Sequence, residues 1–163
     1  MNTRVAIQGI KGSFHDEVAQ QYFGNQVEIL ACDSFDQLVQ SVVYDNCRQA
    51  VMAIENSIAG SILPNYGLLD QYGLSIVGEH SLSISHNLMA MPGQSISDIQ
   101  EVHSHPMALL QCKQFFHAYP DIKLVESSDT AAVAKEISDN NQIGKGAIAS
   151  QLAADLYGLQ VIN

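Results

Sequence analysis

The stretch Ala53-Ile54-Glu55-Asn56-Ser57-Ile58-Ala59-Gly60-Ser61 decides how the rest of this chain is interpreted. An apolar run over residues 50–54 leads into it and stops abruptly at a carboxylate, an amide and a hydroxyl, on Glu55, Asn56 and Ser57. Open α/β sheets present their chemistry in this way, at the carboxyl end of a buried strand. The stretch therefore predicts an α/β fold and one part of a site.

Outward from this stretch, strand-like and helix-like segments alternate along most of the chain, which predicts two series of βα units with parallel strands. Between the series, the long apolar segment at 74–91 predicts two strands, with a crossing between lobes near residues 80–87. The expected strands are 4–8, 27–32, 50–54, 99–103, 122–125, 146–149 and 160–162, and the expected helices are 14–23, 35–43, 63–72, 104–119, 130–137 and 150–156. Ser13, Ser34 and Ser104 are the expected N-caps of three of these helices.

Composition excludes several classes of protein. The 163 residues are 47% hydrophobic, which is enough for a folded core, yet no apolar run is long enough to cross a membrane. Seven Lys plus Arg against 17 Asp plus Glu give a net charge of −10, which argues against a nucleic-acid partner. Because no signal-like segment begins the chain, we expect a cytoplasmic location. The three widely spaced cysteines form neither a disulfide framework nor a zinc site, and without a P-loop or dinucleotide motif we expect no cofactor.

Small polar residues recur where strands end and helices begin. Helix N-termini carry partial positive charge and unpaired N–H groups, so such places bind carboxylates without Lys or Arg. Glu55, Asn56 and Gln111 add to this signal because none of them is needed as a cap. His103-Ser104-His105 suggests a metal pair or a hydrolase dyad, but Pro106 and the absence of a nucleophile-elbow motif argue against both. The polar clusters lie at 9–14, 55–57, 85–87, 104–106 and 127–130.

Four stretches of the chain resemble motifs of the prephenate dehydratase catalytic domain. Gly9-Ile10-Lys11-Gly12-Ser13-Phe14 is similar to the family's opening motif, and residues 53–61 are similar to its Pro-Ile-Glu-Asn-Ser-x-x-Gly-Ser/Thr motif. Ile84-Ser85-His86-Asn87-Leu88 resembles the hinge-region motif, and residues 102–112 resemble Val-x-Ser-His-Pro-Gln-Ala-Leu-x-Gln-Cys. His15 stands where the family has serine or threonine.

The resemblance implies a two-lobed α/β fold like that of type II periplasmic binding proteins, with mixed sheets, helices on both faces and a cleft between lobes. We expect lobe 1 at residues 1–80, returning at 159–163, and lobe 2 at 81–158. The chain stops at Asn163, before the family's Thr-Arg-Phe element and its regulatory ACT domain. We therefore expect it to resemble a truncated dehydratase domain of low activity.

The implied activity is a hydro-lyase step of phenylalanine biosynthesis, the decarboxylating dehydration of prephenate to phenylpyruvate. Arogenate dehydratase and a binding or sensor module for small carboxylates remain alternatives. The resemblance also implies a homodimer that binds a small-molecule substrate. Backbone amides of Ser13, Ser57 and Ser104 are expected to hold the pyruvyl carboxylate of the substrate. The implied catalytic residues are Asn56, Ser104, Gln111 and, in a supporting role, Glu55; the implied substrate contacts are Gly12, Ser13, Phe14, Ser57, Ser85, His86, Asn87, Leu88, His105 and Thr130.

Overall fold

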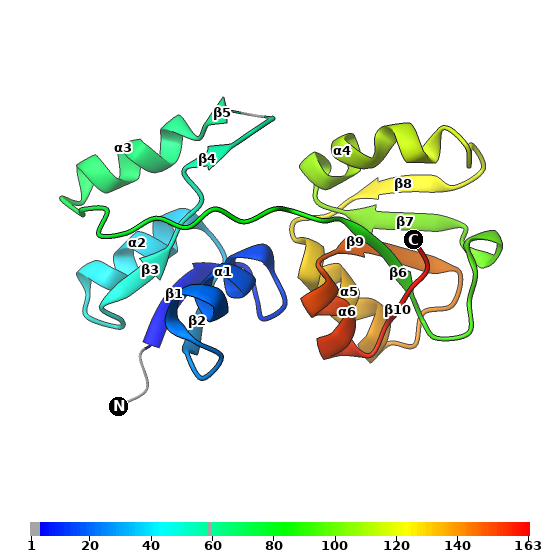
Figure 1. Ribbon diagram of the computed structural model, residues 1–163, viewed down its shortest axis with the longest axis horizontal. Helices are drawn as coiled ribbons and strands as arrows, with labels where there is room; N and C mark the ends of the chain where they lie inside the picture. Colours follow the sequence, from blue (N-terminus) through cyan, green and yellow to red (C-terminus); the bar gives the residue numbers. More distant parts are fainter. Residues whose placement is uncertain (1–3, 59) are drawn as a thin grey trace. The chain divides into compact units, whose positions relative to one another are not determined.

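The protein divides into two compact units, Met1–Leu82 and Ser83–Asn163. The computed structural model describes residues 4–58 and 60–163, drawn in Figure 1. Ala59, within the stretch of residues 53–61, therefore lies outside the described residues. The division falls after Leu82, whereas the sequence predicted it after residue 80.

A three-stranded parallel sheet is the centre of the first unit. Strand β1 (Arg4–Gln8) lies between β2 (Glu28–Cys32) and β3 (Gln49–Val51). Helix α1 (Phe14–Phe23) connects β1 to β2, and α2 (Phe35–Val43) connects β2 to β3. Both helices begin at a serine N-cap, as predicted. Val5, Ala6 and Ile7 of β1 are fully buried, which is typical of a parallel strand covered on both faces.

The second half of the first unit differs from the prediction. Strand β3 ends at Val51, so the apolar run does not continue as a strand to residue 54. The next residues instead form a short antiparallel hairpin, β4 (Glu55–Asn56) and β5 (Gly60–Ser61), followed by α3 (Leu63–Gln71). Residues 74–86 contain no strand, so the first of the two strands predicted within 74–91 is wrong.

The second unit contains a five-stranded mixed sheet in the order β10-β6-β9-β7-β8 (Figure 1). Three of its strands run parallel, namely β7 (Glu101–Ser104), β8 (Lys123–Glu126) and β9 (Lys145–Ala149). Strand β6 (Asn87–Ala90) is antiparallel to β9, and β10 (Gln160–Val161) is antiparallel to β6. The helical elements of this unit are a 3₁₀ turn (Ile96–Asp98), α4 (Pro106–Phe116), α5 (Thr130–Asp139) and α6 (Gln151–Tyr157).

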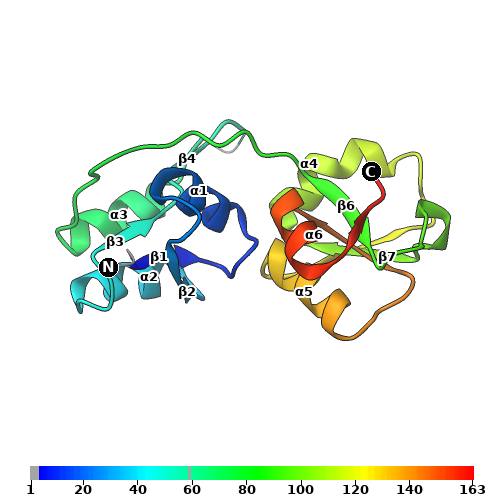
Figure 2. The same ribbon diagram turned by 60° about the horizontal axis from the view of Figure 1, so that its bottom comes forward.

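Helices cover both faces of this second sheet. Figures 1 and 2 show α4 on one side of the sheet and α5 and α6 together on the other. On the α4 side, Val102 and Ile148 of the sheet pack against Leu109 and Phe116 of the helix in one buried cluster. The mixed sheet with helices on both faces matches the predicted fold class. Because helices cover both faces of the sheet, its edges at the strand ends are where a site can lie.

Two local predictions for this unit are corrected. Residues 159–163 do not return to the first unit, because β10 pairs with β6 and the amide of Ile162 donates to the carbonyl of Leu88. Ser104 is not the N-cap of α4, because it is still the last residue of β7. The cap is His105, whose Nδ1 accepts a hydrogen bond from the amide of Met107.

Candidate active-site residues

The β1–α1 loop is a rigid turn at the carboxyl edge of the first sheet. The amide of Ser13 donates to the carbonyl of Ile10 at 3.1 Å, which closes a β-turn with Gly12 at its third position. Gly12 has φ +90°, a conformation that glycine adopts without steric cost. The buried carboxylate of Asp16 accepts the amide of Gly12 at 2.8 Å, while Ser13 Oγ accepts the amide of Asp16 at 3.2 Å.

These contacts bear on the role predicted for the loop. The amide and the hydroxyl of Ser13 both serve the turn and the cap of α1, and the amide of Gly12 is held by Asp16. In this structure the Ser13 amide is paired with the carbonyl of Ile10, and its predicted contact with a substrate carboxylate stays a prediction. Phe14 begins α1 and is half-buried. The loop is thus held in place at the strand end by its own hydrogen bonds.

His15 lies beside this loop as a buried neutral base. Burial lowers the pKa of His15 to about 4, although a hydrogen bond with the backbone of Gln8 opposes the shift. Nε2 is buried, and no described residue forms a hydrogen bond with it. The ring packs edge-on against Phe35, with centroids 5.6 Å apart. The imidazole is thus uncharged at neutral pH, and sequence reasoning assigned it no role.

The β4–β5 hairpin carries Glu55, Asn56 and Ser57. The exposed carboxylate of Glu55 accepts a hydrogen bond from Ser61 Oγ at 3.1 Å across the hairpin. Asn56 Oδ1 accepts the amide of Ile58 at 2.9 Å, which orients the Asn56 amide group within the turn. Ser57 is exposed at the tip. The supporting role expected of Glu55 stays a prediction.

Residues 85–88 lie at the carboxyl edge of the second sheet. Asn87 pairs with Ala149, the last residue of β9, because β6 runs antiparallel to β9. The side-chain amide of Asn87 donates to the carbonyl of Ala149 at 3.4 Å and to that of Ser85 at 3.3 Å. Ser85 is exposed, whereas Leu88 is largely buried among the core residues on the α4 side and lines a pocket at this edge.

His86 and Gln111 form a short hydrogen bond at the same edge. Nε2 of His86 donates to Oε1 of Gln111 at 2.6 Å, joining the start of β6 to the second turn of α4. The bond fixes the Gln111 amide, so its NH₂ group is the part that can donate to an oxygen of a ligand. Both residues line a pocket of about 460 Å³. His86 and Gln111 are thus two predicted site residues whose side chains are in direct contact.

Three further predicted residues begin helices at this edge or lie beneath them. Ser104 is fully buried, and its hydroxyl donates to the carbonyl of Ile148 at 2.7 Å. Its side chain therefore links β7 to β9, and the catalytic role implied for Ser104 stays a prediction. His105 is exposed, but its Nδ1 is used as the cap of α4. Thr130 is half-buried in the first turn of α5, which Asp129 caps through the amide of Ala132.

The chain matches the family model described as Prephenate dehydratase over residues 5–163. It belongs to the prephenate dehydratase family. The match covers both units, so it includes the β1–α1 loop, the β4–β5 hairpin and the His86–Gln111 pair. The motif resemblance noted from the sequence is thereby confirmed at the level of the family, while the role of each residue stays a prediction.

Known proteins that are similar to this chain carry names of more than one activity. Arogenate dehydratase/prephenate dehydratase 2 (chloroplastic) of Arabidopsis thaliana is 39% identical over 161 residues, which are 98% of this chain and 41% of that protein. The chain thus spans less than half the length of this relative. Prephenate dehydratase from Arthrobacter aurescens, solved in complex with L-Phe, has a TM-score of 0.88 at 25% identity, over 99% of this chain and 55% of that one. A structure described as GqqA, a quorum-quenching acylase, has a TM-score of 0.86 at 32% identity, over 98% of this chain and 58% of that one.

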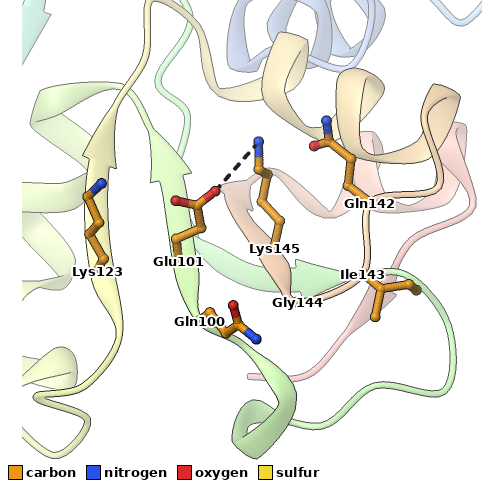
Figure 3. A pocket seen from close by; sticks show the side chains of 7 residues that line it. All are labelled: Gln100, Glu101, Lys123, Gln142, Ile143, Gly144 and Lys145. Atoms are coloured by element: carbon orange, nitrogen blue, oxygen red, sulfur yellow. Dashed lines mark ion pairs between the residues drawn. The ribbon is translucent and has the colours of Figure 1, made fainter.

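A second pocket, of about 510 Å³, lies at the opposite, amino edge of the second sheet (Figure 3). Glu101, Lys123 and Lys145 are the first residues of three neighbouring parallel strands and stand in register. Lys145 Nζ lies 3.8 Å from Glu101 Oε1, and His103 Nε2 lies 3.1 Å from the same oxygen. The neighbouring His103 imidazole, and after it the charges of Lys145 and Lys123, lower the pKa of Glu101, while burial opposes the shift. Sequence reasoning missed this pocket, although a charged residue opening each strand was a visible signal.

In residues 4–58 and 60–163, no group of three or more His, Cys, Asp or Glu side chains is arranged to hold a metal ion. Within the same residues, no helix is both long enough and apolar enough for a membrane span.

Proposed function

We propose that this chain forms the substrate-binding part of a dehydratase that converts prephenate to phenylpyruvate. The observation that carries the proposal is the family match over residues 5–163, which spans the polar groups at both carboxyl edges. Prephenate loses its ring hydroxyl as water and its ring carboxylate as carbon dioxide, and the ring becomes aromatic. Because aromatisation drives the reaction, the protein's tasks are to orient the ring and to help hydroxide leave.

Gln111 is the group best placed to donate a hydrogen bond to a substrate oxygen. His86 holds its amide by the 2.6 Å bond, so the NH₂ group needs no reorganisation when a ligand arrives. Asn56 is oriented in the same manner by the amide of Ile58. We assign both residues to positioning the substrate, while Ser104 supports the fold through its bond to Ile148.

The test is turnover of prephenate by the purified protein, followed by the absorbance of phenylpyruvate. Gln111→Ala is expected to lower turnover by about 10- to 100-fold, because one or two oriented hydrogen bonds are lost. Gln26→Ala is the matched control, since Gln26 is an exposed glutamine in the turn between α1 and β2. Equal losses in both variants, or no phenylpyruvate from the wild-type protein, would refute the assignment.

Arogenate is the alternative substrate, and it differs from prephenate in carrying an amine in place of the keto group. The name of the Arabidopsis relative includes both activities, which supports testing both compounds. Parallel assays with the two substrates, scored as phenylpyruvate and phenylalanine, decide between them. A preference of more than tenfold for arogenate in kcat/KM would assign the protein to arogenate.

An acylase activity is a second candidate because of the similarity to the GqqA structure. Amide hydrolysis by nucleophilic catalysis needs an activated hydroxyl or thiol. The Ser104 hydroxyl is fully buried and donates to a backbone carbonyl, and the Ser13 hydroxyl caps α1. Burial raises the pKa of the Cys112 thiol, which favours the unreactive protonated form. These contacts favour the dehydratase, and hydrolysis of an acyl amide by the protein would reverse that preference.

We further propose a cytoplasmic, homodimeric enzyme. The acidic composition, with a net charge of −10, suits a protein that stays soluble in the cytoplasm. Light scattering of the purified protein tests the dimer, and cell fractionation tests the location.

A further inference from the structure

We infer that the pocket of about 510 Å³ at the amino edge of the second sheet binds a free α-amino acid with a polar side chain, as a zwitterion. The pocket lies wholly within the second unit and takes no group from the carboxyl edge, so it is independent of the proposed function. Its volume is within the range of about 300–1,000 Å³ that is usual for small-molecule sites.

The pocket is built on one face of three neighbouring strands. Glu101 pairs with Lys123 on one side and with Lys145 on the other, so the three side chains leave the sheet on the same face and extend side by side (Figure 3). Successive side chains of a strand point to opposite faces, and Val102 belongs to the core cluster on the α4 side. The charged side chains therefore face α5, and Lys145 Nζ lies 3.8 Å from Glu136 of that helix.

The charged groups that surround the pocket balance one another. Glu101 and Glu136 both lie 3.8 Å from Lys145, and Lys123 stands on the other side of Glu101. The neighbouring imidazole and lysines lower the pKa of Glu101, so its carboxylate is ionised at neutral pH. These two cations and two carboxylates give no net field that would favour a simple anion or a simple cation. A ligand that carries both charges is attracted by both signs at once.

Each charged end of a zwitterion has a matching group in the pocket. Lys123 is exposed, and among the described residues it forms no ion pair. Lys145 and His103 both approach Oε1 of Glu101, and no described residue forms a hydrogen bond or ion pair with its Oε2. Lys123 can therefore bind the carboxylate of the ligand while Oε2 of Glu101 accepts the ammonium group. Neighbouring strands are about 4.8 Å apart, which suits the short spacing of the two charged groups in an α-amino acid.

Amide groups line another part of the pocket and favour a polar side chain on the ligand. Oε1 of Gln142 is buried and has no hydrogen-bond partner among the described residues, although Nε2 of the same side chain donates to Glu136 at 3.2 Å. A buried acceptor without a donor is costly, so an N–H group of a ligand would be stabilised there. Gln100 adds a second, exposed amide. The side chain of L-glutamine supplies such an N–H group, and L-glutamine is therefore the probe.

The experiment titrates L-glutamine into the purified protein and measures the Kd by calorimetry. Two analogues separate the two charges, because glutaramic acid lacks the ammonium group and 4-aminobutanamide lacks the carboxylate. Each analogue is expected to bind at least about tenfold more weakly than L-glutamine, because one charge-assisted contact is lost.

Substitutions test the two groups that bind the charges. Lys123→Gln and Glu101→Gln are each expected to raise the Kd of L-glutamine about tenfold or more, and Lys123→Arg is expected to restore most of the affinity. Lys113→Gln is the matched control for the lysine, since it removes an exposed lysine of α4. Glu126→Gln is the control for the glutamate, since it changes an exposed residue at the opposite end of β8. Both controls are expected to leave the Kd unchanged.

The absence of saturable L-glutamine binding by the wild-type protein would overturn the proposed site, and so would equal binding by Lys123→Gln. Because Lys123 is exposed, this variant is expected to stay folded, which circular dichroism checks. Glutaramic acid that binds as tightly as L-glutamine would show an anion site, and 4-aminobutanamide that does so would show a cation site; either result overturns the zwitterion. Prephenate turnover is expected to be unchanged in Lys123→Gln, so failure of this site and failure of the proposed function are seen in separate assays.

Discussion

Acid sensitivity of the fold should depend on His15. In the folded protein, burial holds the pKa of His15 at about 4, whereas an unfolded histidine titrates near 6.5. Between these two values the unfolded chain binds a proton that the folded chain does not, so stability falls as the pH drops from about 6.5 towards 4. A depression of about 2.5 pH units corresponds to about 3 kcal/mol, lost in full only near and below pH 4.

The assay is denaturant unfolding of the wild-type protein and of His15→Gln at several pH values from 7 down to 4. The wild-type free energy of unfolding should fall by up to about 3 kcal/mol more than that of the variant over this range. Carboxyl groups whose pKa is lowered, such as Asp98 and Glu101, add acid sensitivity to both proteins alike, so the difference isolates the imidazole. His117→Gln, which changes an exposed histidine, should follow the wild type. Parallel curves for wild type and His15→Gln would refute the buried neutral imidazole.

Three further substitutions test the packing beneath the site. Ser104→Ala should lower stability by about 1–3 kcal/mol, because the buried carbonyl of Ile148 loses its donor, while KM stays unchanged in kinetics at a temperature where the variant is folded. Gly146→Ala should cost about 1–3 kcal/mol in a denaturant titration, because the new Cβ would lie 3.2 Å from Val102 Cγ2; a neutral result would show that the core yields there. Ser13→Ala should cost about 1 kcal/mol by loss of the α1 cap, and thermal unfolding without a lower midpoint would contradict that role.

Local sequence signals predicted the first unit well where caps and burial agreed. Strand β1 and helix α1 have the predicted bounds, because a five-residue apolar run and the Ser13 cap each act within a few residues. The apolar run over 50–54 failed for the opposite reason. Only residues Gln49–Val51 pair with β1. The carbonyl of Ile54 instead accepts a hydrogen bond from the amide of Ile62, and the local hydrophobic pattern does not predict this pairing.

Polar residues at strand ends were harder to interpret. Ser104 and Gln111 were both predicted to be site residues. The hydroxyl of Ser104 donates a hydrogen bond to the backbone of β9, whereas the side-chain amide of Gln111 is oriented by His86. The difference depends on sheet register and on which face of α4 meets β6, and neither is visible in a single sequence. Whether a polar side chain can contact a ligand depends more on the hydrogen bonds it already makes within the protein than on its residue type.

The effect of a charge on an anionic ligand likewise depends on the local surroundings of that charge. Net charge acts over distances that salt screens, since the Debye length is about 8 Å at physiological ionic strength. A dianion is therefore repelled only weakly by most of the 17 acidic side chains, while one lysine within about 4 Å attracts it with little screening. Lys145 cannot supply that attraction, because it already lies 3.8 Å from both Glu101 and Glu136. For an anionic substrate, the charge close to the strand ends therefore matters more than the sum of charges over the surface.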